Sequence, residues 1–242
     1  MSTPEISVVV PVCNEETNVE PLAAEIGAAL SGRAFELLFI DDGSTDGTAA
    51  AVLRARAQLP QIRLLQHARR SGQSAALCSG MRAARAEWVA TLDGDGQNDP
   101  ADIPNLIATR DAHSDVAVRL YMGHRQKRRD TWVRRISSRV ANGVRGRMLR
   151  DSTPDTGCGI KLMHRPTFLE LPRFDHMHRF LPALYQRAGT RVVSVPVNHR
   201  PRLTGSSKYG LFDRLWVGIV DLFGVMWLGR RHPPPLDVSE KS

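Results

Sequence analysis

Cysteines, aromatic residues and long uninterrupted apolar runs are all scarce in this sequence of 242 residues. Its three cysteines, Cys13, Cys78 and Cys158, lie far apart and form no Cys-x-x-Cys pair, so we expect neither a zinc site nor a disulfide framework. No Gly-x-Gly-x-x-Gly motif follows a predicted strand, which disfavours an oxidoreductase that binds a dinucleotide. The same cysteine usage makes a reducing cytosol the expected compartment. Pro4 and Glu5 interrupt the start of the chain, so we expect no signal peptide.

Negative charge is also in short supply. The chain has 33 Lys and Arg against 25 Asp and Glu, a net charge of +8. A basic balance of this size indicates an anionic partner, which could be a nucleic acid, an anionic membrane surface or a phosphate-bearing substrate. The length and the 42% hydrophobic content are enough for one large domain or two small ones.

Short buried strands alternate with amphipathic helices through the first half of the chain. The expected strands there are 6–12, 35–40, 62–66 and 88–92, and the expected helices are 19–30, 45–59 and 74–86; a further strand is expected in the second half, at 191–197. This alternation, with short connections, predicts an α/β fold with a doubly wound, mostly parallel sheet covered by helices on both faces. In such sheets the ligand site lies beyond the carboxyl ends of the strands.

Acidic residues follow the predicted strands at that edge, in the segments 41–44 and 93–97. Asp93 and Asp95 are one residue apart in a loop, where both carboxylates can turn toward one hard cation. Mg²⁺ prefers oxygen ligands and is commonly shared with substrate phosphates. Taken alone, the pair is also compatible with an ordinary acidic turn, so both interpretations stay open at this point.

Three motifs in fixed order carry a resemblance to a known family: VVVPVCNEE at 8–16, DDGSTDG at 41–47 and LDGDGQ at 92–97. Together they resemble the family 2 glycosyltransferases of the GT-A fold. Weaker pieces at 123–125, 134–142, 155–161 and 207–209 resemble the polyprenyl-phosphate branch, typified by dolichol-phosphate mannosyltransferase. The resemblance covers roughly residues 5–230. Gly94 and Gly96 depart from the family pattern, which more usually has Ala and Leu there.

On the donor side, the resemblance implies residues for the nucleotide-sugar and for a cofactor, Mg²⁺ or Mn²⁺. The implied donor-binding residues are Pro11, Cys13, Glu15, Asp42, Asp93 and Lys208. The implied metal ligands are Asp93, Asp95 and Gln97. The leading donors are GDP-mannose and UDP-glucose, so the sugar would be a hexose, mannose or glucose.

On the acceptor side, the resemblance implies a set of residues that bind phosphate. They are Arg125, Arg134, Ser138, Arg139 and Arg202. The implied catalytic set is Asp93, Asp95, Arg125 and Asp155, where Asp155 would orient the acceptor or a catalytic arginine, or merely cap a loop. A polyprenyl phosphate with a second pKa near ~6 is already ionised at neutral pH, so the expected reaction needs no strong general base and inverts the sugar.

Two segments indicate a membrane surface. A basic helix with an apolar stripe is expected at 131–150, with an ordinary solvated face as the alternative. The apolar run 211–228 contains Asp213, Arg214 and Asp221, which disfavour a membrane span. We therefore expect an interfacial or re-entrant helix on the cytoplasmic face, or else a long core helix. Stable attachment would then need a membrane-protein partner or a homo-oligomer.

The expected division is a GT-A domain at 1–210, a membrane-associating helix at 211–231 and a polar tail at 232–242. Within the GT-A domain, residues 1–122 would form the nucleotide-sugar and metal half, and residues 123–210 the acceptor half.

Three other functions compete with this interpretation. A phosphohydrolase of the haloacid dehalogenase type would place its Asp-x-Asp motif near the N-terminus, followed by Thr or Val, whereas Gln97 follows here. A nucleic-acid-binding protein would fit the charge, but no aromatic stacking platform is visible, so no nucleic-acid partner is expected. A glycosyltransferase acting on a saccharide or lipid hydroxyl in cell-envelope synthesis would need a general base, often an acid near Asp155.

Overall fold

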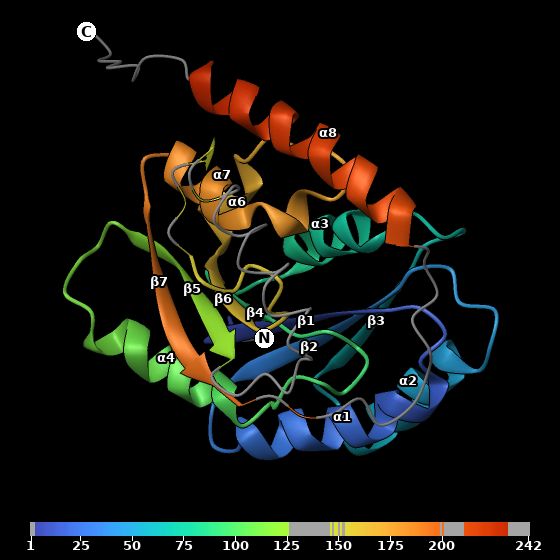
Figure 1. The fold of residues 1–242 in the computed structure, drawn as a ribbon. Coiled ribbons are helices and arrows are strands. Elements are labelled where there is room, and N and C mark those ends of the chain that lie inside the picture. Colours follow the sequence, from blue (N-terminus) through green and yellow to red (C-terminus); the bar gives the residue numbers. More distant parts are fainter. Residues whose placement is uncertain are drawn as a thin grey trace, which may run out of the picture.

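The computed structural model describes residues 3–125, 146, 148–149, 151, 153–198, 200 and 211–231, with backbone alone for 211–217. A seven-stranded sheet with the order β3-β2-β1-β4-β6-β5-β7 lies at its centre (Figure 1). The strands are β1 (Ile6–Val12), β2 (Phe35–Asp41), β3 (Ile62–Gln66), β4 (Trp88–Thr91), β5 (Val118–Arg125), β6 (Lys161–His164) and β7 (Arg191–Val197). Strands β3, β2, β1 and β4 are parallel, β6 is antiparallel to both β4 and β5, and β7 is parallel to β5.

Helices cover both faces of this sheet. They are α1 (Glu16–Ala29), α2 (Thr48–Gln58), α3 (Gln73–Ala83), α4 (Asp102–Ala112), α6 (Arg165–Leu169), the short 3₁₀ helix η1 (Met177–Arg179), α7 (Leu181–Arg187) and α8 (Leu211–Arg230). In Figure 1, α1, α2 and α4 lie below the sheet, and α3, α6, α7 and α8 lie above it. The prediction of a doubly wound, mostly parallel sheet is therefore confirmed, with β6 as the antiparallel exception.

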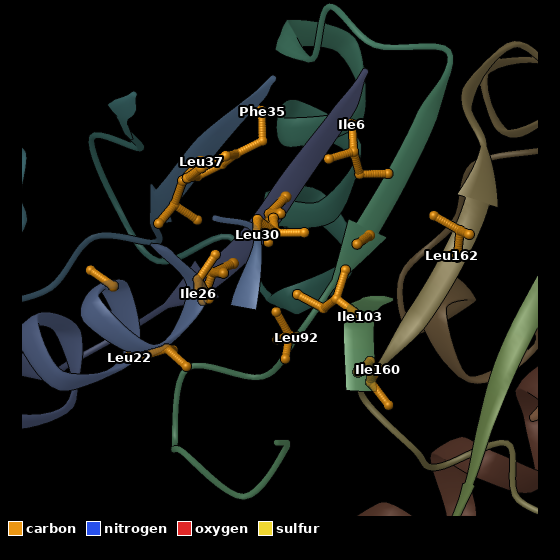
Figure 2. Packing of buried hydrophobic residues seen from close by; sticks show 14 of the residues in the cluster. Ile6, Leu22, Ile26, Leu30, Phe35, Leu37, Leu92, Ile103, Ile160 and Leu162 are labelled. Atoms are coloured by element: carbon orange, nitrogen blue, oxygen red, sulfur yellow. The ribbon is translucent and has the colours of Figure 1, made fainter. Parts of the chain in front are cut away.

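The alternation of side chains along β1 shows why both faces are filled. Val8 and Val10 belong to the apolar cluster under α1, while Val9 belongs to the cluster under α3. Successive strand residues point to opposite faces, so a strand covered on both sides needs a continuous apolar run. Figure 2 shows the first cluster, in which Ile6 of β1 and Leu37 of β2 pack with Ile26 of α1.

A buried carboxylate joins the strands β1, β2 and β3 on the α3 side. Glu36 accepts hydrogen bonds from Ser7 Oγ at 2.7 Å, from the main-chain N–H of Arg85 at 2.6 Å and from Arg63 Nη1 at 2.6 Å. Burial alone would raise the pKa of Glu36, but these bonds and the Arg63 charge hold it below its usual value of 4.5.

The expected boundary at 122/123 falls inside β5, so the two expected halves of the GT-A domain share one sheet. At the C-terminal end, α8 is a helix of 20 residues that packs on α7. Within the part of the chain that the structure describes, no helix is long and apolar enough to cross a membrane. The expected helix at 131–150 lies almost wholly outside the described residues.

Candidate functional site

The loop after β4 lies tightly against the end of β1. A Cβ on Gly94 would stand 2.9 Å from the carbonyl oxygen of Pro11 and 2.8 Å from Val12 Cγ1. Only glycine allows this approach, which brings the strand ends of β1 and β4 together. The Gly94 that departs from the family pattern therefore has a packing reason in this chain.

Asp93 lies in a pocket at this junction. Gln73 Nε2, at the first position of α3, donates to Asp93 Oδ1 at 3.0 Å, and the main-chain N–H of Asp93 donates to Asn98 Oδ1 at 3.0 Å. Gly159 lies so close that an added Cβ would stand 2.1 Å from Asp93 Oδ2. The carboxylate is thus bonded to Gln73 through Oδ1 and lies close to Gly159 through Oδ2.

Several charges act on the Asp93 carboxylate. Burial raises the pKa of Asp93, and nearby Asp95 adds to the rise, while Lys161 and Arg125 oppose it. The ammonium of Lys161 is itself buried and donates to the carbonyl oxygen of Cys158. Burial lowers the pKa of Lys161, and Asp93 opposes that shift. The site therefore contains two acids and two cations that depend on one another.

The Asp93–Gln97 loop offers the oxygen ligands that a hard divalent cation prefers. Asp95 Oδ1 accepts the main-chain N–H of Gln97 at 3.2 Å, which fixes the turn between the two acids. Across the described residues, no three His, Cys, Asp or Glu side chains gather around one metal position. Two carboxylates completed by the phosphates of a substrate remain the donor set that fits Mg²⁺ or Mn²⁺ here.

Arg125 and Asp155 form a bidentate pair. Arg125 Nε lies 2.6 Å from Asp155 Oδ2, and Nη2 lies 2.7 Å from Oδ1. Asp155 is buried, and its hydrogen bonds are the first cause that raises the pKa of Arg125, against its burial. Of the three roles considered for Asp155, contact with an arginine is the one for which the structure shows a partner. Such a fork also fixes the direction of the guanidinium.

Asp42 has its carboxylate fully engaged by its own fold. Oδ1 accepts from the main-chain N–H of Ser71 at 2.8 Å and lies 2.8 Å from His67 Nδ1, and Oδ2 accepts from the N–H of Gly72 at 2.8 Å. Gly72 precedes α3 and has a φ of 93°, a left-handed conformation that glycine adopts without strain. Asp42 therefore positions the start of α3, where Gln73 reaches Asp93, and its expected contact with a nucleoside stays a prediction.

The remaining donor-side residues lie at the end of β1. Pro11 lines the same pocket as Asp93, and Cys13 is a half-buried cysteine that forms no disulfide. Glu15 precedes α1, where its main-chain N–H donates to Thr48 Oγ1 at 2.9 Å and its carboxylate accepts from Asn18 at 2.7 Å. The structure thus brings Pro11 to the pocket, whereas Glu15 makes contacts that hold α1 and α2.

Among the pocket residues that sequence reasoning missed are Gln73, Lys161 and His178. Lys161 closes a motif that the resemblance had already marked, which was a usable signal. Gln73 and His178 carry no local signal, because they reach the pocket from α3 and η1 through tertiary packing. Five predicted site residues lie outside the described residues: Arg134, Ser138, Arg139, Arg202 and Lys208.

Comparison with known families decides what kind of protein carries this site. A family model described as glycosyl transferase family 2 matches residues 7–171, which include Asp93, Asp95, Arg125 and Asp155. The chain belongs to this family. The predicted membership is confirmed. In this glycosyltransferase, those four residues lie at the edge of the sheet where β4 and β5 end.

Curated relatives place the glycosyltransferase among enzymes named for polyprenyl phosphates. It is 35% identical to a dodecaprenyl-phosphate galacturonate synthase of Rhizobium johnstonii over 240 residues, covering 96% of this chain and 69% of the relative. It is also 35% identical to an undecaprenyl-phosphate 4-deoxy-4-formamido-L-arabinose transferase of Edwardsiella ictaluri over 210 residues, covering 85% of this chain and 63% of the relative. The chain thus spans about two thirds of the length of these relatives.

Solved structures agree on the fold. Glucosyl-3-phosphoglycerate synthase of Mycobacterium tuberculosis, in complex with Mg²⁺ and UDP, superposes with a TM-score of 0.71 at 20% identity, covering 95% of this chain and 80% of that one. A mannosyltransferase of Pyrobaculum calidifontis, in complex with GDP-mannose and Mn²⁺, gives a TM-score of 0.69 at 20% identity, covering 97% and 67%. The glycosyltransferase therefore has the fold that was predicted from its motifs.

Proposed function

We propose that this glycosyltransferase moves a sugar from a nucleotide-sugar to a polyprenyl phosphate at a membrane surface, with inversion at the anomeric carbon. The observation that carries the proposal is the meeting of Asp93 and Asp95 with Arg125 and Lys161 at one edge of the sheet. The names of the two relatives, each a transferase to a polyprenyl phosphate, supply the acceptor class.

Asp93, Asp95 and Gln97 would hold Mg²⁺ or Mn²⁺ together with the diphosphate of the donor. Such a cation stabilises the charge that develops on the leaving nucleoside diphosphate. Gln73 donates to the Asp93 carboxylate, and Asn98 Oδ1 holds the main chain of Asp93 by accepting its N–H. Pro11 forms part of the pocket wall, with Cys13, Glu15, Asp42 and Lys208 as the proposed surroundings of the nucleotide.

Arg125 is the described residue best placed to receive a phosphate. Its Nε and Nη2 are bound to Asp155, and this leaves Nη1 as the guanidinium nitrogen outside the fork. The Asp155 carboxylate holds the Arg125 guanidinium in one orientation, so the side chain need not change rotamer when the substrate binds. The acceptor phosphate is already ionised, so catalysis consists of positioning and charge neutralisation rather than proton removal. Arg134, Ser138, Arg139 and Arg202 remain proposed partners of the acceptor phosphate.

The same relatives bear on the sugar. Mannose or glucose, from GDP-mannose or UDP-glucose, was the prediction from motif resemblance. The relatives are named for galacturonate and for a 4-formamido-4-deoxypentose, so these two sugars are equally strong candidates. We keep the four sugars as the candidate set and leave the choice to experiment.

The outer face of α8 suits a lipid surface. Val220, Phe223 and Trp227 are 54%, 54% and 59% exposed and repeat at helical spacing, so they form one apolar stripe. Arg231 lies 6.0 Å from the Trp227 ring, and exposed Arg230 is beside it. An apolar stripe ending in two arginines matches an anionic bilayer surface, on the cytoplasmic side, where the donor is available. A membrane-protein partner or a second copy would be alternative occupants of this face.

The proposed division of labour follows from these assignments. Residues 1–210 form one glycosyltransferase unit, with the donor and metal half in 1–122 and the acceptor half in 123–210. Residues 211–231 bind the membrane, and residues 232–242 are a polar tail.

The test is a transfer assay with the full chain on vesicles that contain undecaprenyl phosphate. Four labelled donors are offered with Mn²⁺: GDP-mannose, UDP-glucose, and the nucleotide-linked forms of galacturonate and 4-formamido-4-deoxyarabinose. We expect label from one donor to enter the organic phase, and Asp95→Asn to abolish it. Asp111→Asn is the matched control, because Asp111 is an exposed acid on α4. Full activity of Asp95→Asn in excess chelator would refute the metal site, and label confined to a saccharide would refute the acceptor.

A further inference from the structure

A short turn, residues 175–179, fills the space between α8 and the start of α3. Met177, at its centre, is fully buried, and its sulfur lies 3.7 Å from Cys78 Sγ on α3. Leu222 and Val225 of α8 belong to the same apolar cluster as Met177. The turn therefore packs against both helices, and a shift of one helix is transmitted to it.

On the α3 side, the turn reaches the pocket of Asp93. His178 Nδ1 lies 2.8 Å from Ser74 Oγ, and the main-chain N–H of His178 donates to the same oxygen at 3.3 Å. Burial lowers the pKa of His178 to about 3, so this imidazole is neutral at physiological pH. Ser74 directly follows Gln73, which donates to Asp93 Oδ1. The His178 contact with Ser74 thus helps to set the position of the Gln73 side chain.

On the α8 side, the turn makes an incompletely satisfied contact. His176 Nδ1 lies 3.2 Å from Asp221 Oδ2, an ion-pair distance. That oxygen is buried, yet among the residues that the structure describes it accepts no well-aligned hydrogen bond. His176 also has a φ of 61°, an uncommon left-handed value for a residue with a side chain. A left-handed residue of this kind keeps its conformation only where its surroundings hold it, so the His176 contact with Asp221 ties the turn to α8.

We propose that the 175–179 turn couples the seating of α8 on an anionic lipid surface to the geometry of Asp93. His176 and His178 are its positioning residues, because one contacts α8 and the other contacts the α3 end that holds Gln73. Contact with lipid along Val220, Phe223 and Trp227 fixes α8, and the turn then fixes the start of α3. Asp93 is thereby held in its binding geometry at the membrane, which is where the polyprenyl phosphate lies. The coupling rests on the proposed function for its lipid and its metal.

The experiment compares the full wild-type chain with Asp221→Asn, which keeps the shape of the side chain but removes its charge. Hydrogen exchange of the amides of residues 72–78 is measured with and without vesicles of phosphatidylglycerol. In the wild type, we expect vesicles to slow this exchange about fivefold or more, since coupling between sites typically changes affinities by that factor. In Asp221→Asn, vesicle binding should persist and the slowing should be lost. Glu20→Gln on α1, with the same change in charge, should behave as wild type.

The second readout is the affinity for Mn²⁺ alone, corrected for Mn²⁺ held by the vesicles. Vesicles should tighten Mn²⁺ binding in the wild type and leave it unchanged in Asp221→Asn. Because coupling is reciprocal, Mn²⁺ should also tighten vesicle binding. If the chain bound the vesicles but the hydrogen exchange of residues 72–78 did not change, the coupling would be refuted and the proposed function would stand. Slowed exchange without any Mn²⁺ binding would instead refute the metal site. A chain that does not bind the vesicles would refute both the lipid surface and its coupling.

Discussion

Gly159 offers a sharp test of the Asp93 site, because a single methyl group placed there must displace the carboxylate. An alanine Cβ would stand 2.1 Å from Asp93 Oδ2 and 2.5 Å from Asn98 Oδ1. Relaxed contacts between heavy atoms lie near about 3.5 Å, so Asp93 has to move by roughly 1.4 Å. Metal–ligand distances tolerate only about 0.2 Å, and the hydrogen bond from Gln73 holds the carboxylate against such a shift.

We expect Gly159→Ala to reduce metal-dependent transfer by about 100-fold, the loss typical of a 1 Å misplacement of a reacting group. The fold should persist, because Thr91 Oγ1 donates to the carbonyl oxygen of Gly159 and this bond needs no change at Cα. Overpacking costs about 1–3 kcal/mol, so the Tm should fall by about 2–12 °C. The assay is the initial rate of transfer as a function of Mn²⁺ concentration, well below the Tm.

Gly157→Ala is the matched control. Its added Cβ would stand 3.5 Å from Arg125 Nη2 and 3.8 Å from Asp155 Oδ1, which are ordinary contacts in the same loop. This variant should keep most of its activity and the Mn²⁺ dependence of the wild type. If Gly159→Ala transferred sugar at the wild-type rate and with the wild-type Mn²⁺ affinity, the crowding at Asp93 would have no catalytic meaning and our assignment of the metal loop would be wrong.

Three further predictions concern other parts of the chain. Asp155→Asn removes the charge that holds Arg125, so transfer should fall about tenfold or more while Mn²⁺ affinity changes little. Folding lowers the pKa of Glu36, so its ionised carboxylate adds to the free energy of unfolding above about pH 4.5, and this contribution is lost as the pH falls through the lower folded-state pKa. In Glu36→Gln, the free energy of unfolding measured in urea should therefore fall less steeply with decreasing pH. Replacing Phe223 and Trp227 by Ser should release the chain from anionic vesicles in a sedimentation assay, since each buried ring contributes roughly 1.5–3 kcal/mol.

Each of these has its own control. Asp111→Asn makes the same chemical change as Asp155→Asn on an exposed acid, and equal losses in both would point to a general effect of charge. An unchanged acid branch of the stability curve in Glu36→Gln would contradict the pKa shift. Leu53→Ser removes an exposed apolar side chain from α2, and it should leave vesicle binding intact. If Leu53→Ser released the chain as readily, α8 would not be the lipid-binding face.

Runs of β-branched and apolar residues predicted the bounds of three strands. The expected ranges 6–12, 62–66 and 191–197 coincide with β1, β3 and β7. Helix starts were less predictable, because they depend on contacts that sequence spacing does not reveal. Asp46 accepts from the main-chain N–H of Thr48 at 3.0 Å, so α2 begins at Thr48 rather than at the expected position 45. The antiparallel direction of β6 also left no local signal.

The sequence predicted the site residues that lie close together along the chain, and it did not predict those that only tertiary packing brings to the pocket. Asp93 and Asp95 follow one strand, so their spacing suggested a cation site, and the resemblance of the three motifs then favoured it over an acidic turn. Gln73 and His178 are ordinary residues in the sequence, and they become part of the pocket only because the loop held by Asp42 and the 175–179 turn carry them there. Their roles depend on long-range hydrogen bonds, which composition and periodicity do not encode.

The position of β6 explains how one sheet edge gathers residues from both halves of the chain. Lys161, its first residue, pairs with Thr91 at the carboxyl end of β4. Because β6 runs antiparallel to β4, the loop that enters β6, with Asp155 and Gly159, arrives at the edge where β4 ends and Asp93 begins. Strand β5 is antiparallel to β6, so its last residue, Arg125, arrives at that edge as well. A parallel β6 would have sent this loop to the opposite edge, and the guanidinium of Arg125 would then lack both its carboxylate partner and its place beside Asp93.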